Sequence, residues 1–213
     1  LSDRVEALMN AFWPGPLTLL LPRTAAVPDE VTAGRPLVGV RMPAHPMALE
    51  LIETAGVPVA APSANRFGGI SPTTAKHVLE DLDERIDAVL DGGATTVGVE
   101  STVLDVEQML IYRPGAVTAV MIAAVVGEGA GAVTVFQAQA IELSTPPEGL
   151  PSPGVGLRHY APKARLVLVE GSLERIGELL AQQAEKLAGE KIGIMQLEEI
   201  HATVMRAEVY AWG

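Results

Sequence analysis

The sequence predicts an α/β protein whose larger part is an α+β twisted open sheet, joined by a linker to a smaller Rossmann-like β-α-β domain. Three observations support this prediction. Short apolar runs alternate with segments of helical periodicity through the first 126 residues. Prolines and glycines then crowd residues 144–164, which favours an extended linker. Beyond the linker, two apolar runs flank one helical stretch, the order expected of a β-α-β unit.

The composition excludes several classes of protein. Hydrophobic residues make up 48% of the 213 residues, enough for a core, and aromatics only 4%, so the core should be aliphatic. No apolar run is long enough to cross a bilayer, and there is no cysteine for disulfides or thiolate catalysis. The lack of cysteine fits a cytoplasmic protein. The net charge of −11 argues against broad, non-specific binding of nucleic acid.

Helices are predicted where apolar residues recur at helical spacing between capping signals. The first covers residues 3–12, with Ser2 as N-cap and "WPGP" as its end. The second covers 46–55 and is closed by Gly56. The others are predicted over 71–82, with Ser71 as N-cap and Pro72 at the first helical position, over 118–126 and over 172–188.

Strands are predicted at the short apolar runs between these helices. The run "VPVAA" at 57–61 is expected to be a buried strand because it lacks polar side chains. The other strands are predicted at 17–23, 37–41, 87–91, 101–106, 110–113, 165–170 and 191–196.

These elements predict a first domain over residues 1–143, a linker over 144–164 and the start of a second domain over 165–213. The chain begins at Leu1, within what resembles a helix already in progress, and "EVYAWG" resembles a strand just reaching a loop. Both domains are therefore expected to be cut from a longer parent.

The segment "AAPSANRFGGIS", residues 60–71, is the first candidate site. Ser63 and Asn65 follow a predicted strand, at the sheet edge where α/β proteins bind ligands. Ser71 opens a predicted helix, whose N-terminus attracts anions. The same residues also suit a plain turn, with hydroxyls and amides bonded to their own backbone. Spacing alone leaves both interpretations open.

Two arginines and one hydroxyl-rich stretch give further candidates. Arg41 ends an apolar strand and could hold a carboxylate through two hydrogen bonds, although a surface salt bridge is the simpler interpretation. Arg113 ends another strand and could face a phosphate or solvent. Ser101 lies in "GGATTVGVESTVLDV", a stretch that by itself favours a threonine-rich hairpin. His159 and Tyr160 lie in the linker, which could close over a site or dock the two domains.

Common nucleotide-binding and hydrolase signatures are absent. The sequence has no G-x-x-x-x-G-K-[ST], no G-x-G-x-x-G after a strand, no H-E-x-x-H and no G-x-S-x-G. With no cysteine and four scattered histidines, no dedicated metal site is expected.

Six motifs in order resemble the Sua5/YrdC family of L-threonylcarbamoyladenylate synthases. They are "FWPGPLTLLLPR", "VGVRMPAHP", "APSANRFGGISPTT", "DGG…GVESTVLDV", "YRPGAVT" and "SPGVGLRHYAP". Each motif alone is weak, and their shared order over about residues 10–213 makes the resemblance specific. The linker and the β-α-β unit after it resemble the two-domain Sua5 type, which implies a YrdC-like first domain.

The resemblance implies an enzyme, a nucleotidyltransferase, and its substrates. ATP, bicarbonate and L-threonine would give threonylcarbamoyl-AMP and pyrophosphate, with Mg²⁺ expected on the nucleotide. The product would serve the threonylcarbamoyladenosine (t6A) modification at position 37 of tRNA, through downstream tRNA threonylcarbamoyl-transferase proteins. The family implies a cytoplasmic enzyme with no membrane contact and at most weak contact with tRNA.

The resemblance also implies roles for residues at matching positions. L-threonine would be bound by Arg41, Ser63 and Ser101. ATP would be bound by Leu37, Ala61, Ser63, Asn65, Ser71 and Arg113. His159 and Tyr160 would belong to the linker over the site, and no residue is assigned to covalent catalysis.

The sequence departs from the family at one point. The family begins with a strand-rich segment carrying a threonine-contacting residue and a Lys-x-Arg pair that faces the ATP phosphates, and nothing here matches it. The chain is therefore expected to lack about the first third of the catalytic domain, and to have weak or no activity alone. The alternatives are an RNA- or nucleotide-binding YrdC-like module without catalysis, a regulatory fragment, and a relative of carbamoyl-transfer proteins, which usually carry further domains that are absent here.

Overall fold

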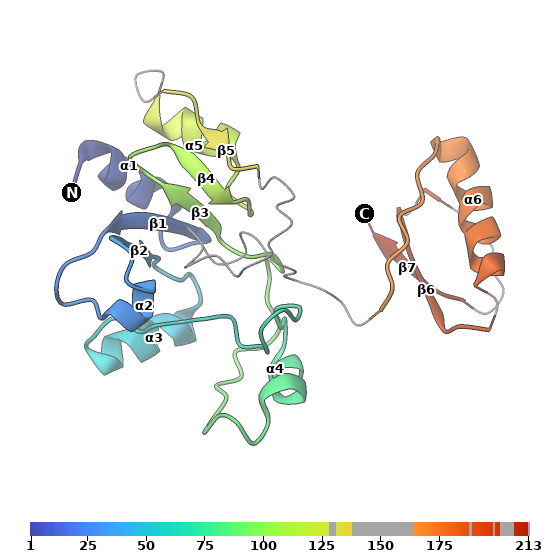
Figure 1. The fold of residues 1–213 in the computed structure, drawn as a ribbon, viewed down its shortest axis with the longest axis horizontal. Helices are drawn as coiled ribbons and strands as arrows, with labels where there is room; N and C mark the ends of the chain where they lie inside the picture. Colours follow the sequence, from blue (N-terminus) through green and yellow to red (C-terminus); the bar gives the residue numbers. More distant parts are fainter. Residues whose placement is uncertain (128–130, 138–163, 188, 198, 201–206, 213) are drawn as a thin grey trace. The chain divides into compact units, whose positions relative to one another are not determined.

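The computed structural model describes residues 1–127, 131–137, 164–187, 189–197, 199–200 and 207–212 (Figure 1). Contacts divide the chain into two compact units, Leu1–Ala161 and Pro162–Gly213. The predicted linker at 144–164 lies almost wholly outside the described residues, so the domain boundaries stay a prediction.

The first unit is built on a five-stranded mixed sheet, which confirms the predicted fold class. Its order is β2 (Leu37–Val40), β1 (Leu17–Pro22), β3 (Thr102–Asp105), β4 (Leu110–Arg113) and β5 (Thr134–Val135). The β1/β3 and β4/β5 pairs are parallel, and the β1/β2 and β3/β4 pairs are antiparallel.

The core of this unit lies between the sheet and two helices. α1 (Asp3–Phe12) and α5 (Ala119–Val126) contact each other and lie along the sheet in Figure 1. Leu8 of α1, Ile122 of α5 and Leu104 of β3 are all fully buried. Because β1 and β3 are central strands, their apolar residues are shielded by neighbouring strands as well as by helices.

A buried carboxylate shapes the turn between β3 and β4. Asp105 is almost wholly buried, and its Oδ1 accepts hydrogen bonds from the backbone N–H groups of Glu107 and Gln108 at 3.0 and 2.9 Å. These bonds replace the water that the carboxylate loses, which explains why a charged residue ends a buried strand.

Most predicted helices are confirmed. α1 has Ser2 as its N-cap, and α3 (Pro46–Ala55) ends at Gly56, which takes the left-handed conformation with φ 65°. The remaining helix of the early region, α2 (Asp29–Thr32), is one turn long and was not predicted.

The predicted start of the helix at Ser71 was wrong. α4 (Ala75–Leu82) begins at Ala75, and Thr74 is its N-cap, accepting a hydrogen bond from the backbone N–H of His77 at 3.3 Å. The hydroxyl of Ser71 donates to Glu100 instead, and Ser71 lies outside α4.

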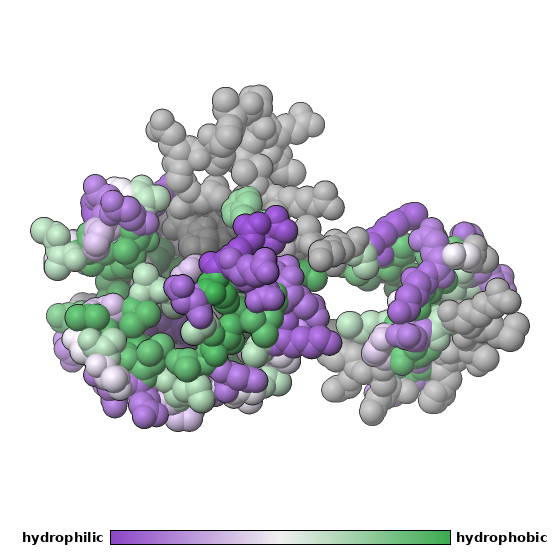
Figure 2. Space-filling model, turned by 90° about the horizontal axis from the view of Figure 1, so that it is seen from below, coloured by the Kyte–Doolittle hydropathy of each residue, from purple (hydrophilic) through white to green (hydrophobic). Residues whose placement is uncertain are grey.

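Three predicted strands were also wrong. Residues 57–61, 87–91 and 165–170 form no strand in the structure. Val57 and Val59 are 60% and 45% exposed rather than buried. A strand requires a hydrogen-bonded neighbour, and no described strand pairs with these runs, so their apolar composition did not place them in a sheet. Figure 2 shows hydrophobic side chains exposed on the first unit.

The second unit contains α6 (Leu173–Lys186) and a parallel pair, β6 (Ile192–Leu197) and β7 (Ala207–Trp212). Ile176, Ala184 and Ile194 form its buried interior with Ile200. The parallel strands agree with the predicted Rossmann-like class. No helix in the described parts of either unit is long and apolar enough to cross a membrane.

Candidate active site

Four strands bring polar residues to one end of the five-stranded sheet, the end at which β1 and β3 begin, which we call its edge. Thr18 lies near the start of β1, and Ser101 immediately precedes β3, which runs parallel to β1. Arg113 ends the antiparallel strand β4 and pairs with Val103. Because parallel strands start together and antiparallel strands end where their neighbours start, these residues converge.

Arg41 reaches the same edge from β2. Val40, the last residue of β2, pairs with Leu19, so Arg41 follows at the level of Thr18. The backbone N–H of Gly15 donates to the carbonyl of Met42 at 2.9 Å and anchors this turn beside the start of β1. Arg41 is exposed, and no hydrogen-bond or ion-pair partner is found for it in the described part of the chain. The salt bridge considered for Arg41 is therefore not seen among those residues.

Hydrogen bonds lock the guanidinium of Arg113 onto Ser101. Its Nε donates to the Ser101 carbonyl at 3.0 Å, and its NH2 donates to the Ser101 Oγ at 2.9 Å. The same Oγ lies 2.8 Å from the Oγ1 of Thr18. Arg113 is 16% exposed, so the solvated strand end considered from the sequence does not describe this side chain.

Glu100 connects this cluster to the distant Ser71. One carboxylate oxygen of Glu100, Oε1, accepts the hydroxyl proton of Ser71, and the other, Oε2, lies 3.7 Å from NH1 of Arg113. The backbone supports the connection, because Thr95 N–H donates to the Thr73 carbonyl at 2.9 Å. We call Thr18, Ser71, Glu100, Ser101 and Arg113 the edge cluster.

The loop before Ser71 is tied to α4. The backbone N–H of Asn65 donates to the carbonyl of Ser63 at 2.9 Å, and its Nδ2 donates to the carbonyl of Arg66 at 3.0 Å. The N–H of Arg66 in turn donates to Asp81 of α4 at 3.3 Å. These bonds match the plain-turn interpretation, although Asn65 Oδ1 is a buried atom without a hydrogen-bond partner.

The remaining predicted site residues are not brought into the edge cluster. Ala61 and Ser63 are exposed on the loop just described. Leu37 lies at the opposite end of β2 from Arg41, paired with Pro22. His159 and Tyr160 lie outside the described residues.

Sequence reasoning missed two members of the edge cluster. Glu100 lies within one of the six motifs, but no function was predicted for it. Thr18 is the one hydroxyl residue in the apolar run "LTLLL". A polar residue inside a central strand needs a partner, and that requirement was the available signal for Thr18.

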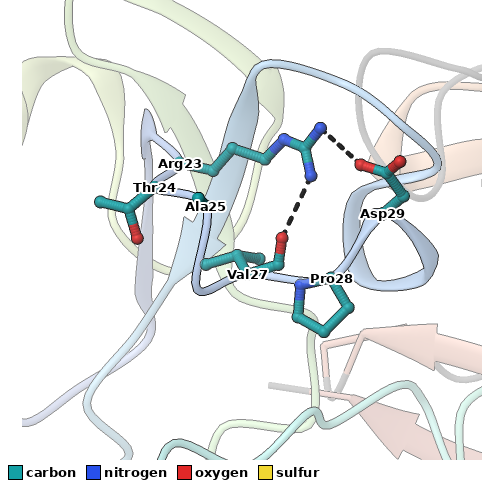
Figure 3. A pocket seen from close by; sticks show the side chains of 6 residues that line it. All are labelled: Arg23, Thr24, Ala25, Val27, Pro28 and Asp29. Atoms are coloured by element: carbon teal, nitrogen blue, oxygen red, sulfur yellow. Dashed lines mark hydrogen bonds and ion pairs between the residues drawn. The ribbon is translucent and has the colours of Figure 1, made fainter.

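The concave surface that the structure shows near α2 is a different feature. A cavity of about 500 Å³ lies beyond the end of β1, opposite to Thr18, and is lined by Arg23, Thr24, Ala25, Val27, Pro28 and Asp29 (Figure 3). Arg23 donates to the Val27 carbonyl at 3.1 Å and pairs with Asp29 at 2.5 Å. Its charge is thus compensated by its own loop, and it does not match the predicted substrate site.

The sheet and the edge cluster define an α/β protein in which hydroxyls, a carboxylate and a guanidinium group from separate segments meet at one edge of the sheet. The Sua5/YciO/YrdC model, described as "Telomere recombination", matches residues 1–115, and a model described as "Threonylcarbamoyl-AMP synthase, C-terminal domain" matches 117–211. The chain belongs to the Sua5/YrdC family, in its two-domain Sua5 type. The second model begins inside the first unit, since α5 packs in the core with α1.

Similar proteins agree with this assignment. A Bacillus subtilis threonylcarbamoyl-AMP synthase is 44% identical over 200 residues, which are 92% of this chain and 55% of the relative. A Pyrococcus abyssi threonylcarbamoyl-AMP synthase is 41% identical and covers 92% of this chain and 56% of the relative. The chain thus spans about half the length of these relatives.

A solved structure is similar over the whole chain. The crystal structure of P. abyssi Sua5 complexed with L-threonine superposes with a TM-score of 0.84 at 38% identity, covering 100% of this chain and 61% of that one. A P. abyssi Sua5 carrying H234A and Y235A gives a TM-score of 0.80.

Proposed function

We propose that this protein synthesises L-threonylcarbamoyl-AMP from L-threonine, bicarbonate and ATP, with release of pyrophosphate. The observation that carries the proposal is the edge cluster, where Arg113 and two hydroxyl residues from separate strands meet at one sheet edge. The synthases similar to this chain over 92% of its length support the same activity.

The threonine half of the site is assigned to Arg41, Ser101 and Ser63. The exposed guanidinium of Arg41 suits a carboxylate, which it can hold through two charge-assisted hydrogen bonds. Ser101 lies at the same edge, and with Thr18 as the donor in their contact, the hydroxyl hydrogen of Ser101 can be donated to a substrate group while the contact is kept. The similar P. abyssi Sua5 was crystallised as a complex with L-threonine, which supports L-threonine as a ligand of this protein.

The nucleotide half is assigned to Arg113 and Ser71 of the edge cluster. Its further contacts would be Leu37, Ala61, Ser63 and Asn65, with His159 and Tyr160 crossing the site. Asn65 has a buried, unpartnered Oδ1, which leaves one acceptor for a ligand donor. In contrast, the position of Leu37 at the far end of β2 gives that assignment the weakest support.

The reaction needs positioning more than covalent catalysis. The threonine amine adds to bicarbonate with loss of water and forms a carbamate. A carbamate oxygen then attacks the α-phosphorus of ATP. The bond between the α-phosphorus and the oxygen that bridges it to the β-phosphorus breaks, and pyrophosphate is released. Arg113 would stabilise the charge that develops on the phosphate oxygens, and bound substrates would be held in line for attack.

Mg²⁺ on the ATP phosphates is part of the proposal. Such an ion is usually held by one or two carboxylates together with phosphate oxygens, and it would supply charge neutralisation. No group of three or more His, Asp or Glu side chains that could hold a metal occurs in the described residues. Glu100 is a carboxylate that contacts two residues of the nucleotide half, Ser71 and Arg113.

The product would pass to tRNA threonylcarbamoyl-transferase proteins for modification of adenosine 37. We place this chemistry in the cytoplasm, in keeping with a chain that has no cysteine. Direct tRNA affinity would be weak, because a net charge of −11 opposes a polyanion.

The test combines intact mass with pyrophosphate release. Pyrophosphate is measured with ATP and bicarbonate, with and without L-threonine, on a preparation whose mass is compared with 22.3 kDa. Threonine-dependent release supports the synthase. ATP binding without release from a protein well above 22.3 kDa supports instead a nucleotide-binding module without catalysis, whereas the same result at 22.3 kDa indicates a fragment whose function must be determined from its binding.

A further inference from the structure

Glu100 makes two contacts that join separate parts of the chain. Its Oε1 accepts the hydroxyl proton of Ser71, 29 positions earlier, and its Oε2 faces NH1 of Arg113 at 3.7 Å. Both partners are residues that the proposed function assigns to ATP, whereas Glu100 itself has no assigned role. One carboxylate therefore sets the position of two nucleotide-binding groups.

The environment of the Glu100–Arg113 pair favours a lasting contact. The side chains are 29% and 16% exposed, so both charges are partly removed from water. Charges in such surroundings attract more strongly than at a fully solvated surface, and each would be costly to leave alone. The pair is also fixed at both ends, since Glu100 and Ser101 are adjacent and Arg113 bonds to the latter.

The geometry leaves Arg113 partly free for a ligand. A guanidinium has five N–H donors, and the described contacts engage Nε, NH2 and NH1 once each. Two donors remain for phosphate oxygens. Because these three contacts restrict the Arg113 side chain, its guanidinium is already oriented before ATP binds. ATP would therefore not have to order a mobile side chain.

Ser71 depends on the same carboxylate. Its single hydroxyl hydrogen is donated to Glu100, and this bond fixes the direction in which the lone pairs of the Ser71 oxygen point. No helix cap holds Ser71, because α4 starts at Ala75. Glu100 is thus the group that orients the Ser71 side chain.

We propose that Glu100 is a positioning residue for the ATP half of the site, acting through Arg113 and Ser71. The proposal rests on the proposed function, because it assigns those two residues to ATP. It predicts that the loss of the carboxylate harms ATP binding more than L-threonine binding. A purely structural role would lower stability without this selectivity.

The experiment compares Glu100→Ala, Glu100→Gln and the control Glu80→Ala. Glu80 is an exposed residue of α4 whose ion pair with Lys76 is 3.9 Å long. The dissociation constant for ATP is measured by calorimetry, and KM for ATP and for L-threonine by pyrophosphate release. Thermal unfolding of each variant reports on folding.

We expect Glu100→Ala to weaken ATP binding by about 10–100-fold, the usual effect of losing a partner that orients a ligand-binding side chain. KM for L-threonine should change by less than about threefold, because the Glu100 carboxylate contacts neither Arg41 nor the Ser101 hydroxyl, and Thr18 still holds that hydroxyl. Glu100→Gln keeps an acceptor for Ser71 without the charge, so its ATP affinity should fall between those of Glu100→Ala and the unchanged protein. Glu80→Ala should match the unchanged protein.

A multiple variant tests whether Glu100 acts through Arg113 and Ser71. If it does, Glu100→Ala added to a protein that already carries Ser71→Ala and Arg113→Ala should change ATP affinity by less than about threefold, because both routes are already lost. Independent, multiplicative losses would overturn the proposal. Equal losses of ATP and L-threonine binding, or unchanged ATP binding in Glu100→Ala, would overturn it too.

The outcomes separate this proposal from the proposed function. A protein that binds ATP but releases no pyrophosphate would overturn the synthase assignment, and the calorimetric comparison would still decide the role of Glu100. A protein that binds no ATP would overturn both.

Discussion

The hydroxyls of Thr18 and Ser101 lie 2.8 Å apart although the residues are 83 positions apart in the chain. Thr18 belongs to β1 and Ser101 precedes β3, so the parallel pairing of these strands creates the contact. Ser101 also accepts from Arg113, which makes the hydroxyl pair the centre of the edge cluster.

The first prediction concerns the hydroxyl of Thr18. Thr18→Val keeps the branched shape that suits a strand but removes the hydrogen bond to Ser101, worth about 1 kcal/mol. We expect KM for L-threonine to rise by about fivefold, as that energy implies. Pyrophosphate release at varied L-threonine measures it. Thr18→Ser, which keeps a hydroxyl, serves as the control, and an unchanged KM in Thr18→Val would contradict the assignment of Ser101.

The second prediction concerns Arg41. Because this side chain is exposed, Arg41→Ala should leave thermal stability unchanged. It should weaken the binding of L-threonine by about 10–150-fold, which corresponds to the loss of about 1.5–3 kcal/mol from hydrogen bonds to a charged group. Calorimetry with L-threonine measures the loss. Arg85→Ala, at another exposed arginine, should have no effect, and an equal loss in both variants would point to general charge instead.

The third prediction concerns Gly115, which follows β4 and packs on the backbone of Glu100 and Thr102. A Cβ at this position would lie 2.6 Å from the backbone nitrogen of Thr102 and closer still to the Glu100 carbonyl. Gly115→Ala should therefore lower the free energy of unfolding by about 1–3 kcal/mol and weaken ATP binding, because Glu100 must move.

Denaturant unfolding and calorimetry check both effects of Gly115→Ala. Gly193→Ala is the control, because its added Cβ would meet only the Tyr210 ring at an ordinary 3.6 Å. If Gly115→Ala lowers stability but leaves ATP affinity normal, the packing of Gly115 does not determine the orientation of Glu100.

The fourth prediction concerns pH dependence in the second unit. Tyr210 donates a hydrogen bond to Glu208 at 2.6 Å, and this bond, together with the carboxylate charge, raises the pKa of Tyr210 above its usual value. A raised pKa means that the contact contributes stability below the usual tyrosine pKa and loses it as the pH rises through the raised value.

Glu208→Ala should bring the pKa of Tyr210 back toward its usual value. Tyrosine resonances followed by NMR through alkaline titration measure this change, and Glu190→Ala is the control at another exposed glutamate. A pKa of Tyr210 that stays raised in Glu208→Ala would contradict the stated cause.

Local signals predicted much of the fold because local interactions decide it. Ser2 caps α1 through its own side chain, and Gly56 ends α3 with a positive φ that favours glycine. Central strands such as β1 and β3 were recognisable as apolar runs. Residues 57–61 have the same apolar character, yet they form no strand, because pairing is a property of neighbours and not of the run.

The candidate site divides in the same way. The sequence by itself determined the chemical types available, with Arg41, Ser71, Ser101 and Arg113 each identified from its own motif. Only the tertiary structure decided that Thr18 and Glu100 join them, that Leu37 lies at the far end of β2, and that Thr74 caps α4 in place of Ser71. The physical reason is that strand register and side-chain pairings such as that of Ser71 with Glu100 depend on segments distant in the chain, which no local pattern records.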